Sequence, residues 1–257
     1  MAPRAVFVTG ASRGIGLGIV KAFLEDPSVE IVIAGARNVD GAVDLKKIQE
    51  VDERLHIVQL DVVDDESIDN ALVEIDKIVG EAGLNVLVNN AGIIVPYRAE
   101  TAPDRAKIET AMSVNATSPL ILSQKIAGRL QKAANYYFEK TGDDSLSANR
   151  AAIVNIGSDS SSMALNDGSG QFEVLAHRMS KTALLSFTRT LAMDYKKAEI
   201  PILVTCLHPG WVDSELGGPE APVTVKESTG ALVKSIFNLT ETHAGRLFER
   251  DLTPMPF

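Results

Sequence analysis

Three glycines near the N-terminus are spaced to hold an anion against the start of a helix. The segment Thr9-Gly10-Ala11-Ser12-Arg13-Gly14-Ile15-Gly16 follows a short apolar run and precedes an amphipathic one. Glycines at such a junction permit a tight turn and let the backbone approach a pyrophosphate closely. The N-terminus of the following helix offers free N–H groups and the positive end of its dipole. These residues predict a dinucleotide-binding loop, with Gly10, Ser12, Arg13, Gly14, Ile15 and Gly16 at the phosphates.

The residues after the second apolar run indicate which dinucleotide binds. NAD-binding sites of this kind place an Asp or Glu there, where it accepts hydrogen bonds from the ribose hydroxyls. This chain has Ile33-Ala34-Gly35-Ala36-Arg37-Asn38, with no carboxylate until Asp40. The guanidinium groups of Arg37 and Arg13 could both bind a 2′-phosphate. We therefore expect NADP(H); the competing interpretation is that both arginines are ordinary solvated side chains.

Composition restricts the partners of this chain. It has 257 residues, a net charge of −9 and 45% hydrophobic residues. Because nucleic acids and anionic membranes attract basic faces, we expect neither as a partner. The single cysteine, Cys206, allows no internal disulfide and is expected to be a core residue. We find no metal-ligand spacing, no signal-peptide pattern and no apolar run near the roughly 20 residues of a membrane helix, and we expect a cytoplasmic protein.

Short apolar runs alternate with amphipathic segments along the whole chain. The strand candidates are residues 5–8, 30–34, 55–60, 84–88, 151–156 and 200–207, and the helix candidates are residues 15–24, 40–51, 64–79, 114–130 and 177–195. Continuous apolar strands between helices are typical of a parallel sheet covered on both faces. With right-handed crossovers, this pattern predicts an α/β fold with a doubly wound parallel sheet, a Rossmann fold, in one domain over residues 1–257.

Polar stretches interrupt this alternation. Residues 135–150 are predicted to form an exposed loop that extends a long helix. Stretches near 158–176 and 209–223 follow strand ends, where open α/β sheets bind ligands. Together with residues 93–104 they are predicted to be the substrate loops. The expected apolar walls of the pocket are Phe172, Met163, Tyr97 and Trp211.

Motifs along nearly the whole chain resemble those of the short-chain dehydrogenase/reductase family. They are the glycine spacing Gly-x-x-x-Gly-x-Gly, Leu60-Asp61-Val62, Asn89-Asn90-Ala91-Gly92, the strand that ends at Ser158, and Pro209-Gly210. The segments Arg178-Met179-Ser180-Lys181 and Pro209-Gly210-Trp211-Val212 are similar to the sniffer and C-factor-like carbonyl reductases. The resemblance adds Asp61, Val62, Asn89, Ala91, Gly92, Lys181, Pro209, Gly210 and Val212 to the expected cofactor site. It also implies a homodimer or homotetramer formed through the helices of residues 115–135 and 175–195.

The resemblance further implies an Asn-Ser-Tyr-Lys set that reduces carbonyls. In the family the Tyr donates a proton to the substrate oxygen, the Ser hydrogen-bonds that oxygen, the Lys lowers the phenol pKa and binds the nicotinamide ribose, and the Asn holds a water on the Lys. Asn115, Ser158 and Lys181 match, with Ser160 as an alternative for the serine. The Tyr position, four residues before Lys181, holds His177. This departure puts the proton-donating step in question.

An imidazole in place of the phenol changes the expected chemistry. Histidine has an ordinary pKa of about 6.5, and the nearby Lys181 cation should lower it. The ring is shorter than tyrosine, so we expect ketone reduction to be weakened by about 10²–10⁴-fold. Four interpretations stay open: carbonyl reduction with His177 or a water as proton source, hydride transfer to an iminium ion that needs no proton, cofactor binding without turnover, and an engineered or accidental Tyr→His change. Asp159 and Asp167 could each be an acid or a counter-ion for a cationic substrate.

These observations predict an NADP(H)-dependent oxidoreductase that transfers hydride to a C=O or C=N group of a small organic substrate, with secondary metabolism as one setting. Ser158 and His177 would orient the acceptor, and Lys181 would hold the ribose. The alternatives are a cyclase or Diels–Alder-type protein, as the related reductase-like proteins of fungal alkaloid pathways suggest, and a cofactor-binding protein without turnover.

Overall fold

Seven parallel strands form one sheet in the computed structural model, which describes residues 2–168 and 174–257. The strand order is β3-β2-β1-β4-β5-β6-β7. The strands are β1 (Ala5–Val8), β2 (Ile31–Ala36), β3 (Leu55–Gln59), β4 (Val86–Asn89), β5 (Ala152–Ile156), β6 (Leu203–His208) and β7 (Leu247–Glu249). The chain runs outward from β1 to β3, returns to the middle, and runs outward again from β4 to β7. The predicted doubly wound α/β sheet is therefore confirmed.

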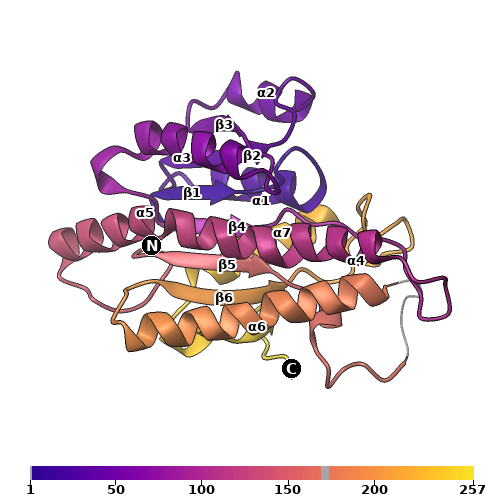
Figure 1. Cartoon of the computed structure of the whole chain (residues 1–257). Helices are drawn as coiled ribbons and strands as arrows, with labels where there is room; N and C mark the ends of the chain where they lie inside the picture. The colour runs from indigo at the N-terminus through magenta and orange to yellow at the C-terminus, as the bar shows by residue number, and fades with distance from the viewer. Residues whose placement is uncertain (1, 169–173) are drawn as a thin grey trace.

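Helices cover both faces of this sheet (Figure 1). They are α1 (Gly14–Leu24), α2 (Val43–Gln49), α3 (Asp65–Val79), α4 (Arg105–Met112), α5 (Ser118–Thr141), α6 (Leu175–Lys197) and α7 (Val225–Phe237). Within β1, Val6 and Val8 pack in the cluster that includes α1 and α7. Ala5 and Phe7 point to the opposite face, where α3, α5 and α6 pack. Both sets of side chains are buried because successive residues of a strand alternate between faces, and this explains the continuous apolar runs.

The structure corrects one expectation and adds elements that the apolar pattern did not single out. Residues 135–141 belong to α5 rather than to an exposed loop. The helix ends at Gly142, whose φ of 70° suits the left-handed C-terminal position that glycine favours. Helices α4 and α7 and the edge strand β7 were not among the predicted elements. Among the described residues, no helix is both long enough and apolar enough to cross a membrane.

The junction after β5 is packed too tightly for any side chain at residue 157. A Cβ atom at Gly157 would lie 2.4 Å from the Sγ atom of Cys206 on the neighbouring strand β6. The backbone N–H of Gly157 donates to the carbonyl of Leu207 at 2.8 Å. This close contact between strands fixes where the chain leaves the sheet, and therefore where the next residue, Ser158, begins.

We predict that Gly157→Ala lowers the free energy of unfolding by about 1–3 kcal/mol, because the added methyl group overpacks the contact with Cys206. Urea unfolding of Gly157→Ala, Cys206→Ala and the double variant measures the effect, and the double variant should be more stable than the sum of the single changes predicts. Gly128→Ala is the matched control, because an added Cβ there meets no atom within 4 Å. Unchanged stability in Gly157→Ala would contradict the packing described here.

Candidate functional site

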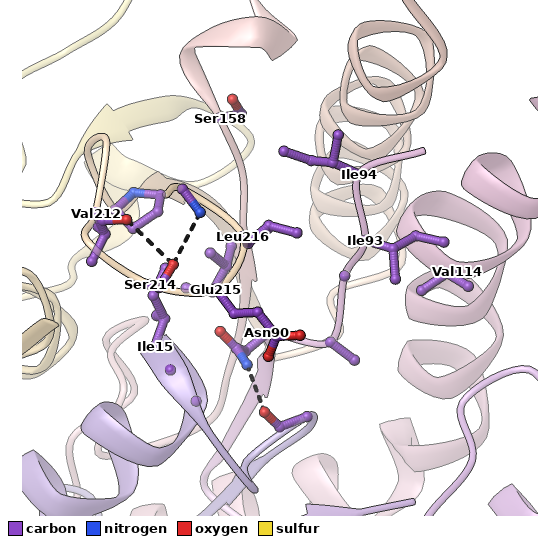
Figure 2. Close-up of a pocket in the computed structure, with 18 of the residues that line it drawn as sticks. Ile15, Asn90, Ile93, Ile94, Val114, Ser158, Val212, Ser214, Glu215 and Leu216 are labelled. Carbon is purple, nitrogen blue, oxygen red and sulfur yellow. Dashed lines mark hydrogen bonds between the residues drawn. The ribbon is translucent and has the colours of Figure 1, made fainter. Parts of the chain in front are cut away.

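A cavity of about 1140 Å³ opens at the carboxyl ends of the central strands. Most of the residues predicted for the cofactor and the chemistry line it together. They are Gly10, Ser12, Arg13, Gly14, Ile15, Gly16, Arg37, Asp61, Val62, Ala91, Gly92, Ser158, His177, Lys181, Pro209, Gly210 and Val212. Figure 2 shows Ser158 at one end of this pocket, with Ile15 and the segment of Ser214 to Leu216 on one wall and Ile93, Ile94 and Val114 on the other.

The glycine loop leaves room and donors for a phosphate. Gly10 and Gly14 have φ angles of 63° and 53°, in the left-handed region that glycine tolerates. A Cβ at Gly16 would lie 2.3 Å from the carbonyl oxygen of Gly10, so no other residue fits there. Helix α1 begins at Gly14, and no side chain caps its N-terminal N–H groups. Uncapped N–H groups at a helix N-terminus bind anions, so this loop fits the pyrophosphate of a dinucleotide.

Two adjacent asparagines take different roles at the end of β4. The buried Asn89 faces the core, where its Nδ2 donates to Asn155 at 2.8 Å and to Ser123 at 3.1 Å. It lies behind the cavity, among the residues that hold β4 and β5 together. Asn90 points the other way and donates from Nδ2 to the carbonyl oxygens of Thr9 and Gly10. Of the two, Asn90 therefore supports the glycine loop directly, although only Asn89 was assigned to the cofactor from the sequence.

Asn115 lies in a π-helical turn between α4 and α5. The turn forms here because Pro119 has no N–H to donate to the carbonyl four residues earlier, which breaks the regular helical ladder at Asn115. The buried side chain of Asn115 accepts a hydrogen bond from the backbone N–H of Ile93 and donates to its carbonyl, both at 2.9 Å. Its Nδ2 also donates to Ser180 Oγ at 2.9 Å. Asn115 thus fixes the loop after β4 against α6.

His177 lies on the first turn of α6 and is 6% exposed. Its Nδ1 lies 3.3 Å from the carbonyl oxygen of Ile93. A carbonyl oxygen only accepts, so Nδ1 carries the hydrogen and donates it. Burial, followed by the neighbouring Lys181 ammonium, lowers the pKa of His177 to about 4. At neutral pH the ring is therefore uncharged, and its remaining nitrogen, Nε2, holds a lone pair.

Lys181 lies one turn further along α6 and is buried as well. Its Nζ donates to the carbonyl oxygen of Ile156, at the end of β5, at 2.8 Å. Burial lowers the pKa of Lys181 to about 8. The thiol of Cys206 lies nearby, but burial raises its pKa to about 12, so it is not an anionic partner at neutral pH. The lysine is therefore a cation fixed at the inner end of the cavity.

Ser158 directs its hydrogen toward the neighbouring Asp159 carboxylate. Its Oγ donates to the Asp159 carboxylate at 2.9 Å and accepts from the backbone N–H of Ser160 at 3.1 Å. Burial raises the pKa of Asp159, but the neighbouring His208 and the hydrogen bonds from Ser158 and Ser160 outweigh it, so the net shift is downward. His208 Nδ1 accepts the backbone N–H of Asp159 at 3.2 Å. This end of the cavity therefore holds an ionised carboxylate.

Comparison with known proteins agrees with this geometry. A family model described as short chain dehydrogenase matches residues 4–222. The chain belongs to the short-chain dehydrogenase family. The crystal structure of Sniffer from Caenorhabditis elegans is 41% identical, with both chains covered completely and a TM-score of 0.89. The NADPH-bound carbonyl reductase from chicken fatty liver is 34% identical over 100% of this chain and 95% of its own, with a TM-score of 0.92.

A bacterial relative extends the comparison. The C-signal of Myxococcus xanthus is 28% identical over 174 residues, which are 68% of this chain and 93% of the C-signal. The family resemblance noted in the sequence, including its sniffer and C-factor-like subgroup, is thereby confirmed. This short-chain dehydrogenase is an oxidoreductase of the carbonyl-reductase type by its family.

The walls of the short-chain dehydrogenase cavity differ in part from those expected. Trp211 lines it, whereas the lining residues of the described chain do not include Met163 or Tyr97. Tyr97 is instead buried beside α4 and accepts the backbone N–H of Asp104. Phe172 lies outside the described residues. Asp159, expected as an acid or counter-ion, lines the cavity, and so does Ser160.

The lining residues that were not assigned a role from the sequence include Ile93, His208, Ser214 and Glu215. Ile93 acts through its backbone carbonyl, which no residue type reveals. His208 directly precedes Pro209, at the end of β6, and that position was the one available signal. Ser214 and Glu215 belong to the predicted loop of residues 209–223, but their contact with the glycine loop depends on the folded chain.

We predict that stability falls as pH drops from about 6.5 toward 4, in part because of His177. Its pKa is lower in the folded chain than in the unfolded chain, so the unfolded state binds the extra proton first. The contribution lost over this window is up to roughly 3 kcal/mol. Urea unfolding across pH 4–7 should show a smaller slope for His177→Gln than for the native chain.

His56→Gln is the matched control, since that imidazole is only half-buried on β3 and should leave most of the slope in place. Proton NMR titration of the His177 ring checks the cause directly. A midpoint near the ordinary value of about 6.5 would contradict the buried, neutral imidazole.

Proposed function

We propose that this chain is an NADP(H)-dependent reductase of a C=O or C=N group in a small organic substrate. One observation carries the proposal: a single cavity joins the uncapped glycine loop and two arginines to His177, Lys181 and Ser158. The nicotinamide supplies the hydride when it is bound. The N–H groups at the start of α1 hold the pyrophosphate, Arg37 and Arg13 hold the 2′-phosphate, and Lys181 holds the nicotinamide ribose.

The directions of the hydrogen bonds favour a cationic C=N acceptor over a carbonyl. The N–H of His177 is used by Ile93, and the O–H of Ser158 is used by Asp159. Of these two donor pairs, the lone pair of His177 Nε2 and the negative charge of Asp159 remain for a substrate. Lone pairs and a carboxylate attract a group that donates an N–H and carries positive charge. A protonated imine has both properties.

The proton balance supports the same preference. Hydride addition to a ketone leaves an oxyanion, which must take a proton to become an alcohol. Neither the neutral His177 nor Ser158 directs a hydrogen toward that oxygen, so the proton would come from a water. Hydride addition to an iminium carbon moves the C=N π electrons onto nitrogen and yields a neutral amine without any proton transfer. His177 is therefore compatible with iminium reduction and poorly suited to ketone reduction.

The other walls of the cavity favour an apolar body on the substrate. Ile94, Leu165, Trp211 and Leu216 line the cavity, and the last three are each at least 44% exposed. Large apolar side chains that face an open cavity bind apolar or aromatic surfaces. The proposed substrate class is thus a compact apolar or aromatic compound with a C=N⁺ or C=O group.

We predict that the native chain oxidises NADPH with cyclic imines and iminium ions, and that His177→Tyr gains at least about tenfold on ketones and aldehydes. The reason is that a phenol restores a proton donor, which contributes about 10²–10⁴-fold where it is well placed. Absorbance at the NADPH band, measured with one panel of imines and one of carbonyls, gives both rates. His177→Phe is the control, since it restores ring size without a hydroxyl.

The two panels separate the alternatives. If His177→Tyr turns over carbonyls and the native chain turns over neither panel, the native chain is not an imine reductase. NADPH binding without turnover of either panel by the native chain would favour the cofactor-binding protein.

We predict that Arg37→Ala weakens NADPH binding by about 10- to 100-fold and leaves NADH binding nearly unchanged. A charge-assisted hydrogen bond to phosphate contributes about 1.5–3 kcal/mol, and NADH has no 2′-phosphate. Titration calorimetry with both cofactors measures the change. Arg178→Ala is the control, because Arg178 also lines the cavity but lies on α6, next to His177. Equal weakening of both cofactors in Arg37→Ala would place Arg37 away from the 2′-phosphate.

A further inference from the structure

Arg13, one of the two arginines assigned to the 2′-phosphate, is already engaged by a carboxylate. Its Nε lies 3.0 Å from Oε2 of Glu215. Both side chains line the cavity, and more than two thirds of each remains exposed. The ion pair joins the glycine loop after β1 to the loop after β6, two segments about 200 positions apart in the sequence, across the mouth of the cofactor site.

The segment that carries Glu215 is held in shape by its own hydrogen bonds. Trp211 Nε1 donates to the carbonyl of Gly217 at 2.8 Å, and the N–H of Gly217 donates to Ser214 Oγ at 3.2 Å (Figure 2 shows the Ser214 bonds). Asp213 donates its backbone N–H to the carbonyl of Val223 at 2.8 Å. Glu215 is therefore presented to Arg13 by a closed loop rather than by a free chain.

The same loop lies directly against the glycine loop. The Cβ atom of Ser214 is 3.8 Å from the position that a Cβ of Gly14 would take, which is ordinary van der Waals contact. Arg37, on the other side, takes part in no ion pair with any residue of 2–168 or 174–257. A 2′-phosphate that enters the site thus meets one available guanidinium and one that a carboxylate occupies.

We propose that Glu215 sets cofactor specificity by competing with the 2′-phosphate for Arg13. The inference rests on the proposed function, because it takes the 2′-phosphate to bind between Arg13 and Arg37. Carboxylate and phosphate oxygens accept from the same N–H groups of a guanidinium, so a 2′-phosphate that pairs with the Nε edge of Arg13 displaces Glu215. NADH has no 2′-phosphate, and its binding leaves the ion pair intact. Glu215 therefore narrows the preference for NADPH over NADH.

The test is the affinity of the full chain for NADPH and NADH, measured through quenching of its one tryptophan, Trp211, which lines the cavity. Because exposed ion pairs are weak, we expect Glu215→Gln to tighten NADPH binding by about two- to fivefold and to change NADH binding less than about 1.5-fold. Glu220→Gln is the matched control: it removes the same charge from the same loop, at a residue outside the lining of the cavity as described. It should change neither affinity.

The Arg13→Ala variant tests whether the effect of Glu215→Gln on NADPH affinity depends on Arg13. In Arg13→Ala, the further change Glu215→Gln should no longer tighten NADPH binding. The competition is overturned if Glu215→Gln still tightens NADPH binding in Arg13→Ala, if it tightens NADPH and NADH binding equally, or if it tightens neither. None of these results contradicts NADPH binding itself. Failure of the native chain to bind NADPH would overturn the proposed function and this inference together.

Discussion

The backbone carbonyl of Ile93 determines the chemistry of this site more than any side chain does. It accepts hydrogen bonds from Asn115 Nδ2 and from His177 Nδ1. Because a carbonyl has no hydrogen to give, this contact selects the tautomer of the imidazole and leaves Nε2 as an acceptor. The loop after β4 is in turn fixed by Asn115, and Asn115 is held by the π-helical turn that Pro119 imposes. The loop that Asn115 holds in place thus presents the carbonyl that leaves Nε2 of His177 for a substrate.

The charges of the site are arranged by depth. Lys181 is buried and donates to the carbonyl of Ile156, while Asp159 is exposed and its negative charge is stabilised by hydrogen bonds from Ser158 and Ser160. A neutral His177 lies close to both. A positive substrate centre would be attracted to the carboxylate of Asp159 and repelled by the ammonium of Lys181. A neutral carbonyl gains little from His177 and Ser158, since the hydrogens of both groups are already used.

Much of the fold and the site was predictable, because short-range rules determine those parts. Glycine at positions 10, 14 and 16 reflects a backbone geometry that other residues do not fit, and unbroken apolar runs reflect strands buried on both faces. Local sequence patterns do not predict contacts between residues that are far apart in the sequence. Nothing near Asn89 and Asn90 shows which one turns toward the core, and nothing near Arg13 reveals Glu215. The end of α5 was missed because residues 135–141 have no aliphatic residues at helical spacing, and the segment is mostly exposed in the folded chain.

The pairing of His177 with Lys181 also has a consequence for the lysine. A phenol at residue 177 can become an anion and can share its charge with a nearby ammonium, which favours the charged form of both. An imidazole becomes only neutral or positive, so it offers the ammonium no such compensation. Burial then lowers the pKa of Lys181 to about 8, and the other nearby titratable group, Cys206, is held as a neutral thiol. Moderate alkalinity therefore neutralises Lys181, the residue proposed to hold the nicotinamide ribose. A reaction that needs no proton from residue 177 tolerates the neutral imidazole, and a cofactor held mainly by its phosphates would tolerate a neutral lysine.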